Sequence, residues 1–426
     1  MGAKMRTTVA STALAQIQSG HRVFVHGGAA TPHILLSELF AQRRRLRNVE
    51  LIHLHTMGET QYAAASLADH FRVTNLFVGK NLRGQMGQAN IDYLPCFLSE
   101  IPSLFRSQTL PLDVALIQVS PPDRHGFCSL GVSVDVALSA IQSAKMILAQ
   151  INPKMPRVHG DGFIPTSRID FAVEAETELP EDKPPAQTPE EEKIGKLVAS
   201  YVEDGSTLQM GIGNVPNSIL SCLGDRRNLG IHTETWSDSA MDLILAGAVD
   251  NSKKAVFPGK TVSSFLVGSR KLYNFVDDNP SVAQLDSAFV NRPEVIAANP
   301  KVVAINSAVE VDLTGQVCAD SIGPRIISGV GGQMDFIRGA TQSVGGKAII
   351  ALTSRTHQGV SRIVPALRTG AGVVTTRAHV HYIVTEYGVA DLWGKPLRER
   401  AKALLAIAHP EDRQKIEEGW ENLCRR

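Results

Sequence analysis

Short, nearly all-apolar runs recur along the chain and are separated by longer amphipathic stretches, and no other pattern limits the possible folds as strongly. Several of these runs are followed directly by Gly, Ser or Pro. A strand buried on both faces is apolar throughout, and parallel strands need long crossover connections, usually helices. The pattern therefore predicts an α/β fold with parallel strands. The predicted strands are Arg22–Val25, Val49–His53, Val114–Val119, Thr207–Met210, Val302–Ile305 and Ala348–Leu352.

A polar stretch at residues 174–193, EAETELPEDKPPAQTPEEEK, interrupts this alternation. Its many Pro and Glu residues suit either a long surface loop or a boundary between two α/β halves, and we favour the boundary. Thr188, Pro189 and the two acids that follow predict a helix N-terminus before IGKLVASYV. The predicted domains are residues 1–180 and 188–426.

The two halves begin alike, with a helix, a strand and then a glycine-rich turn. The strand and turn span Val23–Gly28 in the first half and Leu208–Gly213 in the second. This shared order fits two similar α/β lobes with a cleft between them.

Charge and cysteine usage exclude several classes of protein. The chain has 426 residues with 43 basic and 42 acidic side chains, which gives no reason to expect nucleic acid or an anionic membrane as a partner. No apolar run is long enough for a membrane span, and the N-terminus lacks the apolar core of a signal peptide. Five widely spaced cysteines without a CxxC pair are typical of a reduced protein. We therefore expect a cytoplasmic protein.

Two glycine-rich loops in the second half are candidates for ligand binding. The first, QMGIGNVPN at residues 209–217, follows a predicted strand and precedes the helix-like stretch SILSCLG. The second, SGVGGQMDF at residues 328–336, has three glycines in four positions. Glycine lets backbone N–H groups approach a ligand and a helix N-terminus favours negative charge, so the first loop suits a phosphate or an oxyanion. A tight structural turn is the alternative for both loops.

Glu234 lies in GIHTETWSD, between the hydroxyl residues Thr233, Thr235 and Ser237. A glutamate carboxylate is a competent nucleophile toward an activated acyl group, and short hydroxyl side chains can orient it. The alternative is an ordinary surface acid near the end of a strand.

Two histidine pairs suggest a different chemistry. In His53-x-His55 and His379-x-His381 the alternate side chains point to one face of a strand, so each pair offers two possible zinc ligands. The further carboxylate ligands of a metal hydrolase are not evident. We therefore expect hydrogen-bonded histidines and no metal site.

These segments together resemble the acetyl-CoA hydrolase/transferase family, in particular its 4-hydroxybutyrate and butyryl-CoA:acetate CoA-transferases. GIHTETWSDS is similar to the family's GIHTEMxSDG, QMGIGNVPN to its first glycine loop and GVGGQMDFIRGA to its second. Similar segments extend from about Gly20 to Arg413, and they include VSPPDRHGFCSLGVSVD, INPKMPRVHGD, VEVDLTGQV, HQGVSRIVP and TEYGVADLWGK.

The resemblance implies two open α/β/α lobes of the class I CoA-transferase type, with the active site in the cleft between them. It implies Glu234 as the catalytic residue that carries CoA. The implied CoA-binding residues are Gln209, Met210, Gly211, Ile212, Gly213, Val309, Gly331 and Gly332. No permanently bound cofactor or metal is implied, and the family suggests a homodimer. The chain departs from the family at Ser239, often Gly, and at Cys318, often Asn, which bears on substrate preference.

The implied reaction is a ping-pong exchange of CoA between a short-chain acyl-CoA, such as butyryl- or 4-hydroxybutyryl-CoA, and a small carboxylate such as acetate. It passes through a glutamyl-CoA thioester at Glu234 and needs no general base, since a glutamate is ionised near neutral pH. Water that reaches the intermediate would make the same site an acyl-CoA hydrolase, which is the nearest alternative. A metal hydrolase at the histidine pairs and a non-catalytic CoA-binding protein are the others.

Overall fold

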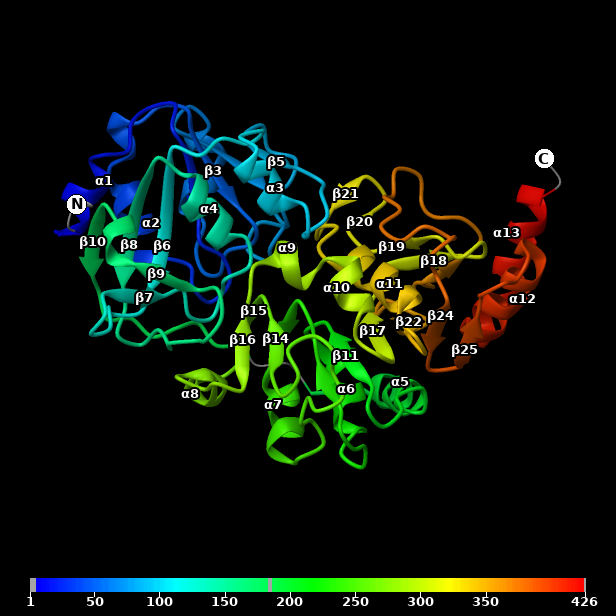
Figure 1. The fold of residues 1–426 in the computed structure, drawn as a ribbon. Coiled ribbons are helices and arrows are strands. Elements are labelled where there is room, and N and C mark those ends of the chain that lie inside the picture. The colour runs from blue at the N-terminus through cyan, green and yellow to red at the C-terminus, as the bar shows by residue number, and fades with distance from the viewer. Residues whose placement is uncertain (1–4, 183–185, 425–426) are drawn as a thin grey trace. The chain divides into compact units, whose positions relative to one another are not determined.

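The computed structural model describes residues 5–182 and 186–424. The chain forms two compact units, Met1–Lys183 with Val262–Val290, and Pro184–Thr261 with Asn291–Arg426. Figure 1 labels their elements where there is room. The division between the units at Lys183 falls in the polar stretch at 174–193, of which residues 183–185 lie outside the described residues. Val262–Val290 groups with the first unit although it follows the start of the second in the chain.

The first unit is built on an eight-stranded sheet in which every pair of neighbouring strands is parallel. Its order is β1 (Arg6–Thr7), β10 (Phe171–Glu174), β8 (Met146–Ile151), β6 (Val114–Val119), β2 (Arg22–Val25), β3 (Val49–His53), β4 (Phe71–Asn75) and β5 (Ile91–Tyr93). The central strand β6 is buried along its whole length, Gln118 included, as its mainly apolar run predicts.

Helices and short strands complete the first unit. Phe105 of α3 and Ala140 of α4 pack against Phe24, Ala115 and Ile147 of the sheet in one apolar cluster. The helices are α1 (Ala10–Leu14), α2 (His33–Ala41), α3 (Ile101–Arg106), α4 (Ala137–Ser143), α8 (Arg270–Val276) and α9 (Ser287–Val290). The short strands are β7 (Phe127–Ser129), which pairs with β9 (Phe163–Pro165), β15 (Phe265–Leu266), and β14 (Thr261–Ser263), which pairs with β16 (Val282–Gln284).

The second unit is built on a six-stranded sheet. Its order is β12 (Gly230–Ile231), β11 (Thr207–Met210), β17 (Val302–Asn306), β22 (Lys347–Ala351), β24 (Tyr382–Thr385) and β25 (Gly388–Asp391). The first five strands are parallel and β25 is antiparallel to β24. All six strands predicted from apolar runs are therefore present, with ends that differ by at most one residue.

The remaining elements of the second unit surround this sheet (Figure 1). The helices are α5 (Pro189–Ala199), α6 (Asn214–Ser221), α7 (Asp238–Leu245), α10 (Pro293–Ala297), α11 (Gln333–Gln342), α12 (Leu397–Ile407) and α13 (Arg413–Cys424). A small sheet joins β19 (Val317–Cys318), β18 (Glu310–Asp312) and β23 (Ile363–Val364), and β20 (Ser321–Ile322) pairs with β21 (Arg325–Ile326). The two-residue strand β13 (Thr235–Trp236) follows Glu234.

The local signals of the sequence explain two helix starts. Thr188 caps α5 in a capping box, because its side chain accepts from the Glu191 N–H while the Glu191 side chain accepts from the Thr188 N–H. Helix α6 begins at Asn214, inside the segment 209–217 predicted as a loop and four residues before the predicted helix-like stretch. Pro216 is tolerated there because the first turn of a helix needs no donor from it.

Within residues 5–182 and 186–424, no helix has both the length and the apolar character needed to cross a lipid bilayer.

Candidate active site

The carboxyl ends of the parallel strands of the second unit gather the predicted functional segments at one edge of the sheet. Glu234 follows β12, and residues 211–213 follow β11. Ser307 follows β17, and Thr353 and Glu386 lie just beyond β22 and β24. Open α/β sheets bind their ligands outside the carboxyl ends of the strands, so this edge is the candidate site.

The Glu234 carboxylate is held by a residue that sequence patterns do not reveal. Asn291, which is fully buried, donates a hydrogen bond from Nδ2 to Oε2 of half-buried Glu234 at 3.0 Å. Gly332 lies against the same pair, since a Cβ built on it would stand 2.0 Å from Glu234 Oε2 and 2.2 Å from Asn291 Nδ2. Only glycine allows this approach, so Gly332 makes room for the Glu234 carboxylate and the Asn291 amide.

The N-terminus of α11 provides a favourable electrostatic environment for this carboxylate. Gly332 is the N-cap of that ten-residue helix, so the helix begins beside Glu234 Oε2. The unpaired N–H groups and the dipole of a helix N-terminus stabilise negative charge nearby. The arrangement favours an ionised carboxylate and a negatively charged intermediate at the same place.

The hydroxyl groups around Glu234 do not orient it as the sequence suggested. Thr233 Oγ1 accepts from the Met210 N–H at 3.3 Å and is placed to donate to the carbonyl oxygens of Met210 and Thr235, at 3.0 and 2.9 Å. Ser237 Oγ lies 3.4 Å from Asn217 Oδ1. The prediction that hydroxyls position the carboxylate was therefore wrong. Thr233 instead fastens the Glu234 loop to the end of β11.

The first glycine loop leaves three backbone donors available. Among the described residues, no hydrogen-bond acceptor is present for the N–H groups of Gly211, Ile212 and Gly213. Gly213 has φ +119°, which favours glycine, although a Cβ there would touch nothing. The loop therefore presents N–H groups to its surroundings immediately before α6.

The Gln209 side chain is already engaged. The Asn306 Nδ2 donates to Gln209 Oε1 at 2.9 Å, and Gln209 Nε2 donates to Asn306 Oδ1 at 3.4 Å. This amide pair links the carboxyl ends of β11 and β17. Stabilisation of an oxyanion by the Gln209 amide would have to share or replace the longer of these bonds.

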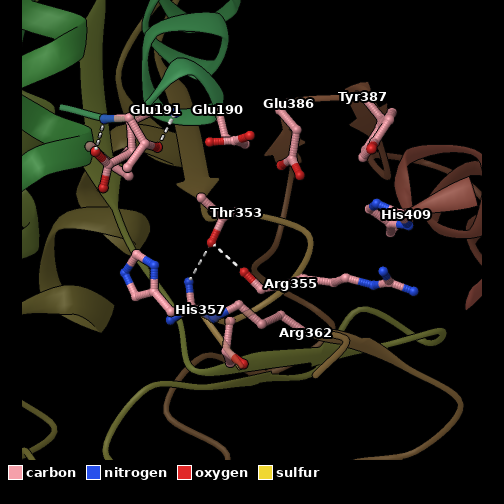
Figure 2. A pocket seen from close by; sticks show the side chains of 12 residues that line it. Glu190, Glu191, Thr353, Arg355, His357, Arg362, Glu386, Tyr387 and His409 are labelled. Carbon is pink, nitrogen blue, oxygen red and sulfur yellow. Dashed lines mark hydrogen bonds between the residues drawn. The ribbon is translucent and has the colours of Figure 1, made fainter. Parts of the chain in front are cut away.

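A cavity of 430 Å³ adjoins the same edge, and Figure 2 shows its lining. It is bordered by the N-terminal turns of α5 and α6, by the segments after β22 and β24, and by His409, which precedes η5 (Pro410–Asp412). Its charged and titratable side chains are Glu190, Glu191, Arg355, His357, Arg362, Glu386, Tyr387 and His409. Asn214 Nδ2 donates to Glu191 Oε2 at 3.2 Å and so connects the start of α6 to the cavity wall.

The two histidine pairs lie in different units and have different surroundings. Burial, with a smaller effect of His55, lowers the pKa of His53 to about 3, so that ring stays neutral. His381 stacks against Trp393 with ring centroids 4.2 Å apart. In the part of the chain that the structure describes, no group of three or more His, Cys, Asp or Glu side chains is placed to hold a metal ion.

Comparison with known proteins identifies the family. The acetyl-CoA hydrolase/transferase N-terminal domain matches residues 4–180, and the C-terminal domain of the same family matches residues 268–420. A succinyl-CoA:acetate/propanoyl-CoA:succinate CoA transferase of Fasciola hepatica is 51% identical over 406 residues, covering 94% of this chain and 84% of the relative. The chain belongs to the acetyl-CoA hydrolase/transferase family. It is accordingly an enzyme of the CoA-transferase class.

Two further members of the family agree with this assignment. A 4-hydroxybutyrate coenzyme A transferase of Clostridium kluyveri is 48% identical over 414 residues, covering 97% of this chain and 96% of the relative. The solved structure of a 4-hydroxybutyrate CoA-transferase from Porphyromonas gingivalis superposes with a TM-score of 0.85 at 36% identity, covering 99% of this chain and 98% of the other. The predicted α/β fold with two sheets is therefore confirmed.

The remaining residues implied by the family occupy the same unit. Gly331, with φ +57°, immediately precedes Gly332. Gln333 Nε2 donates to the Ser307 carbonyl at 2.7 Å and so ties the start of α11 to the segment that leads to Val309. The Val309 N–H donates to the Cys318 carbonyl at 2.8 Å. Their roles in binding CoA stay predictions.

The two departures from the family have distinct local effects. Ser239 Oγ is 3.1 Å from Asn217 Oδ1, so it joins the first turn of α7 to α6. Cys318 is fully buried, and its thiol lies 3.1 Å from the Ser321 carbonyl oxygen. Ser239 therefore affects the helix that follows the glycine loop, whereas Cys318 affects the strand that carries the bond to Val309.

Proposed function

We propose that this enzyme exchanges CoA between a short-chain acyl-CoA, such as butyryl- or 4-hydroxybutyryl-CoA, and a small carboxylate such as acetate. The observation that carries the proposal is the arrangement around Glu234, whose carboxylate accepts from Asn291 and lies against Gly332 at the N-terminus of a helix. Such surroundings keep a carboxylate charged and in one position, which a nucleophile requires.

The first half-reaction converts the carboxylate into a thioester. Glu234 attacks the acyl carbonyl of the acyl-CoA, the C–S bond breaks, and an acyl-glutamyl anhydride and CoA thiolate result. The thiolate then attacks the glutamyl carbonyl and expels the donor acid as its carboxylate. The enzyme is left as glutamyl-CoA thioester, with the total charge unchanged.

The second half-reaction reverses these steps with a new acid. The incoming carboxylate attacks the carbonyl of the glutamyl thioester. The C–S bond breaks, CoA thiolate departs, and an acyl-glutamyl anhydride forms. The thiolate then attacks the acyl carbonyl of that anhydride, which releases the new acyl-CoA and restores the Glu234 carboxylate. No proton has to be transferred in either half-reaction.

Each attack passes through a tetrahedral oxyanion, and the chain offers donors for it. The Asn291 amide is placed at the glutamyl oxygen, and the N–H groups of residues 211–213 are available near the end of β11. Removing one such donor in an oxyanion hole typically costs about 3–4 kcal/mol of transition-state stabilisation. In this proposal the glycine loop serves CoA and its thioester end.

The comparisons support CoA transfer but divide on the acids. The Clostridium kluyveri relative is named for 4-hydroxybutyrate, and the Fasciola hepatica relative for succinyl-CoA with acetate and for propanoyl-CoA with succinate. Competition among butyrate, 4-hydroxybutyrate, acetate, propionate and succinate as acceptors would rank them by kcat/KM. The homodimer implied by the resemblance and the cytoplasmic location expected from the sequence stay predictions.

The decisive experiment traps the intermediate. The enzyme is incubated with butyryl-CoA without acetate, treated with borohydride and analysed by peptide mass spectrometry, with Glu234→Gln as the control. Reduction of a glutamyl thioester to the alcohol should lower the mass of the Glu234 peptide alone and abolish activity. Unmodified Glu234 in an enzyme that still turns over would refute the proposal. Turnover without any acceptor acid would favour the acyl-CoA hydrolase alternative.

A further inference from the structure

The cavity in Figure 2 contains an arginine, Arg362, that forms no ion pair with the described residues and feels the charge of Glu386 only at longer range. Arg362 Nη1 donates to Thr353 Oγ1 at 3.2 Å, while its buried Nε has no hydrogen-bond partner. No carboxylate of the described residues lies within the 4.0 Å of an ion pair with it. A guanidinium remains charged in proteins, so a half-buried one without an acid is costly unless a ligand supplies the anion.

The second arginine of the cavity, Arg355, has its guanidinium fully paired with carboxylates. Arg355 binds Asp412 through Nε at 2.7 Å and Nη2 at 2.8 Å, and Glu411 through Nη1 at 2.7 Å. Glu386 also lines the cavity. Its carboxylate accepts from the Ser354 N–H at 2.8 Å and from the Ser354 Oγ at 2.6 Å. Arg355 is therefore fully paired and Glu386 is bound to Ser354, whereas Arg362 has no carboxylate in contact with it.

The opposite wall of the cavity carries an acceptor. Glu190 lies in the first turn of α5, is exposed, and appears in Figure 2 across the cavity from Arg362. A ligand with a phosphate at one end and an amino group at the other could place the phosphate at Arg362 and the amino group at Glu190. The volume of 430 Å³ is in the usual range for a small-molecule site.

The position of the cavity relates it to the glycine loop. Val215, which lines the cavity, is two residues beyond Gly213, and the Asn214 side chain is bonded to Glu191 in the cavity wall. The loop thus runs from the end of β11, to which Thr233 fastens the Glu234 segment, directly to this cavity. A long ligand that reacts at Glu234 can follow the loop and end there.

We propose that this cavity binds the nucleotide end of CoA, with Arg362 pairing with a phosphate and Glu190 accepting from the adenine amino group. The inference rests on the proposed function for the identity of the ligand. The chemistry that the cavity recognises is that of a phosphorylated adenosine.

The test uses adenosine 3′,5′-bisphosphate, which carries the nucleotide without the thiol arm, in calorimetric titrations of the full chain. Arg362→Gln should weaken its binding by about 10- to 100-fold, the usual effect of losing a charge-assisted hydrogen bond. Arg398→Gln removes an equal charge from an exposed site on α12 and should have no effect. Should Arg362→Gln fail to fold, His357→Glu at an exposed position of the rim should also weaken binding by repelling the phosphate.

Kinetics then separate recognition from a merely structural role. Arg362→Gln should raise KM for butyryl-CoA about 10- to 100-fold with little change in kcat, and leave kcat/KM for butyryl-pantetheine, which lacks the nucleotide, at the wild-type value. Equal losses on both substrates, or none on butyryl-CoA, would overturn the inference. The bisphosphate could bind in an Arg362-dependent way while borohydride gives no adduct at Glu234. That result would support the nucleotide site and refute only the proposed covalent chemistry at Glu234.

Discussion

Gly332→Ala tests the geometry around Glu234, the proposed nucleophile, most directly. The added Cβ would stand 2.0 Å from Glu234 Oε2 and 2.2 Å from Asn291 Nδ2, whereas such contacts essentially never fall below 3.0 Å. The carboxylate oxygen must therefore retreat by about 1 Å, and its hydrogen bond to Asn291 is broken or displaced. Asn291 is fully buried, so the amide has little room to follow.

The expected loss follows from both effects. Displacing a reacting group by about 1 Å typically costs ~10²-fold in rate, and a hydrogen bond to a charged group is worth about 1.5–3 kcal/mol. We expect kcat to fall at least ~10²-fold and the borohydride-trapped adduct at Glu234 to be much reduced. Overpacking of this kind also costs about 1–3 kcal/mol of unfolding free energy, which urea denaturation measures.

The control is Gly224→Ala in the same unit, where a Cβ would meet nothing within 4 Å and the backbone has no positive φ. It should leave kcat and stability near the wild-type values. If Gly332→Ala retained the wild-type kcat and stability, the close approach of Gly332 to the carboxylate would not govern catalysis, and the reasoning from this geometry would be refuted.

Three further changes have defined outcomes. Asn291→Asp places a second carboxylate where an amide donates to Glu234 at 3.0 Å, so kcat should fall ~10²-fold. Activity should recover partly at lower pH, where the two acids share a proton, and a flat pH profile of kcat would contradict this. Burial lowers the pKa of Lys254 from 10.5 to about 7, and its amine donates to the carbonyls of Ile231 and Lys260, which a neutral amine satisfies with its two N–H groups. Between about pH 7 and pH 9 the folded state therefore binds fewer protons than the unfolded state, so the unfolding free energy should rise by ~2 kcal/mol over this range. Lys254→Met should not show this rise. Ser239→Gly removes the bond to Asn217 and adds a helical glycine, so thermal unfolding should show a loss of about 1–2 kcal/mol with kcat unchanged; a changed kcat would mean that Ser239 acts on the reaction itself.

Local patterns in the sequence predicted much of the second unit. The apolar run of β11 and the glycines after it predicted a strand followed by a tight loop, and Thr188 with Pro189 predicted the start of α5. These signals are readable because strand burial, glycine conformation and helix capping act within a few neighbouring residues. The carboxylate at Glu234 was also marked locally, although by hydroxyl neighbours that turned out to bind elsewhere.

Tertiary structure decided what surrounds that carboxylate. Asn291 is 57 positions from Glu234 in the chain, and nothing in its neighbourhood marks it as a donor. The glycine requirement at Gly332 looks in the sequence like loop flexibility or room for a ligand, whereas in the fold it is room for the Glu234 carboxylate. The pairing of Gln209 with Asn306 likewise spans 97 positions.

The distance along the chain over which residues interact explains what the sequence could and could not predict. A sequence specifies elements through contacts between near neighbours, so the chain alone determined its strands, several helix ends and the glycine loops, and it marked Glu234 as the candidate nucleophile. Which side chains meet depends on where the parallel strands end relative to one another, and that is set by packing across the whole sheet. Only the folded second unit therefore brought Asn291 to Glu234, and placed Arg362 in a cavity where its Nε has no hydrogen-bond partner.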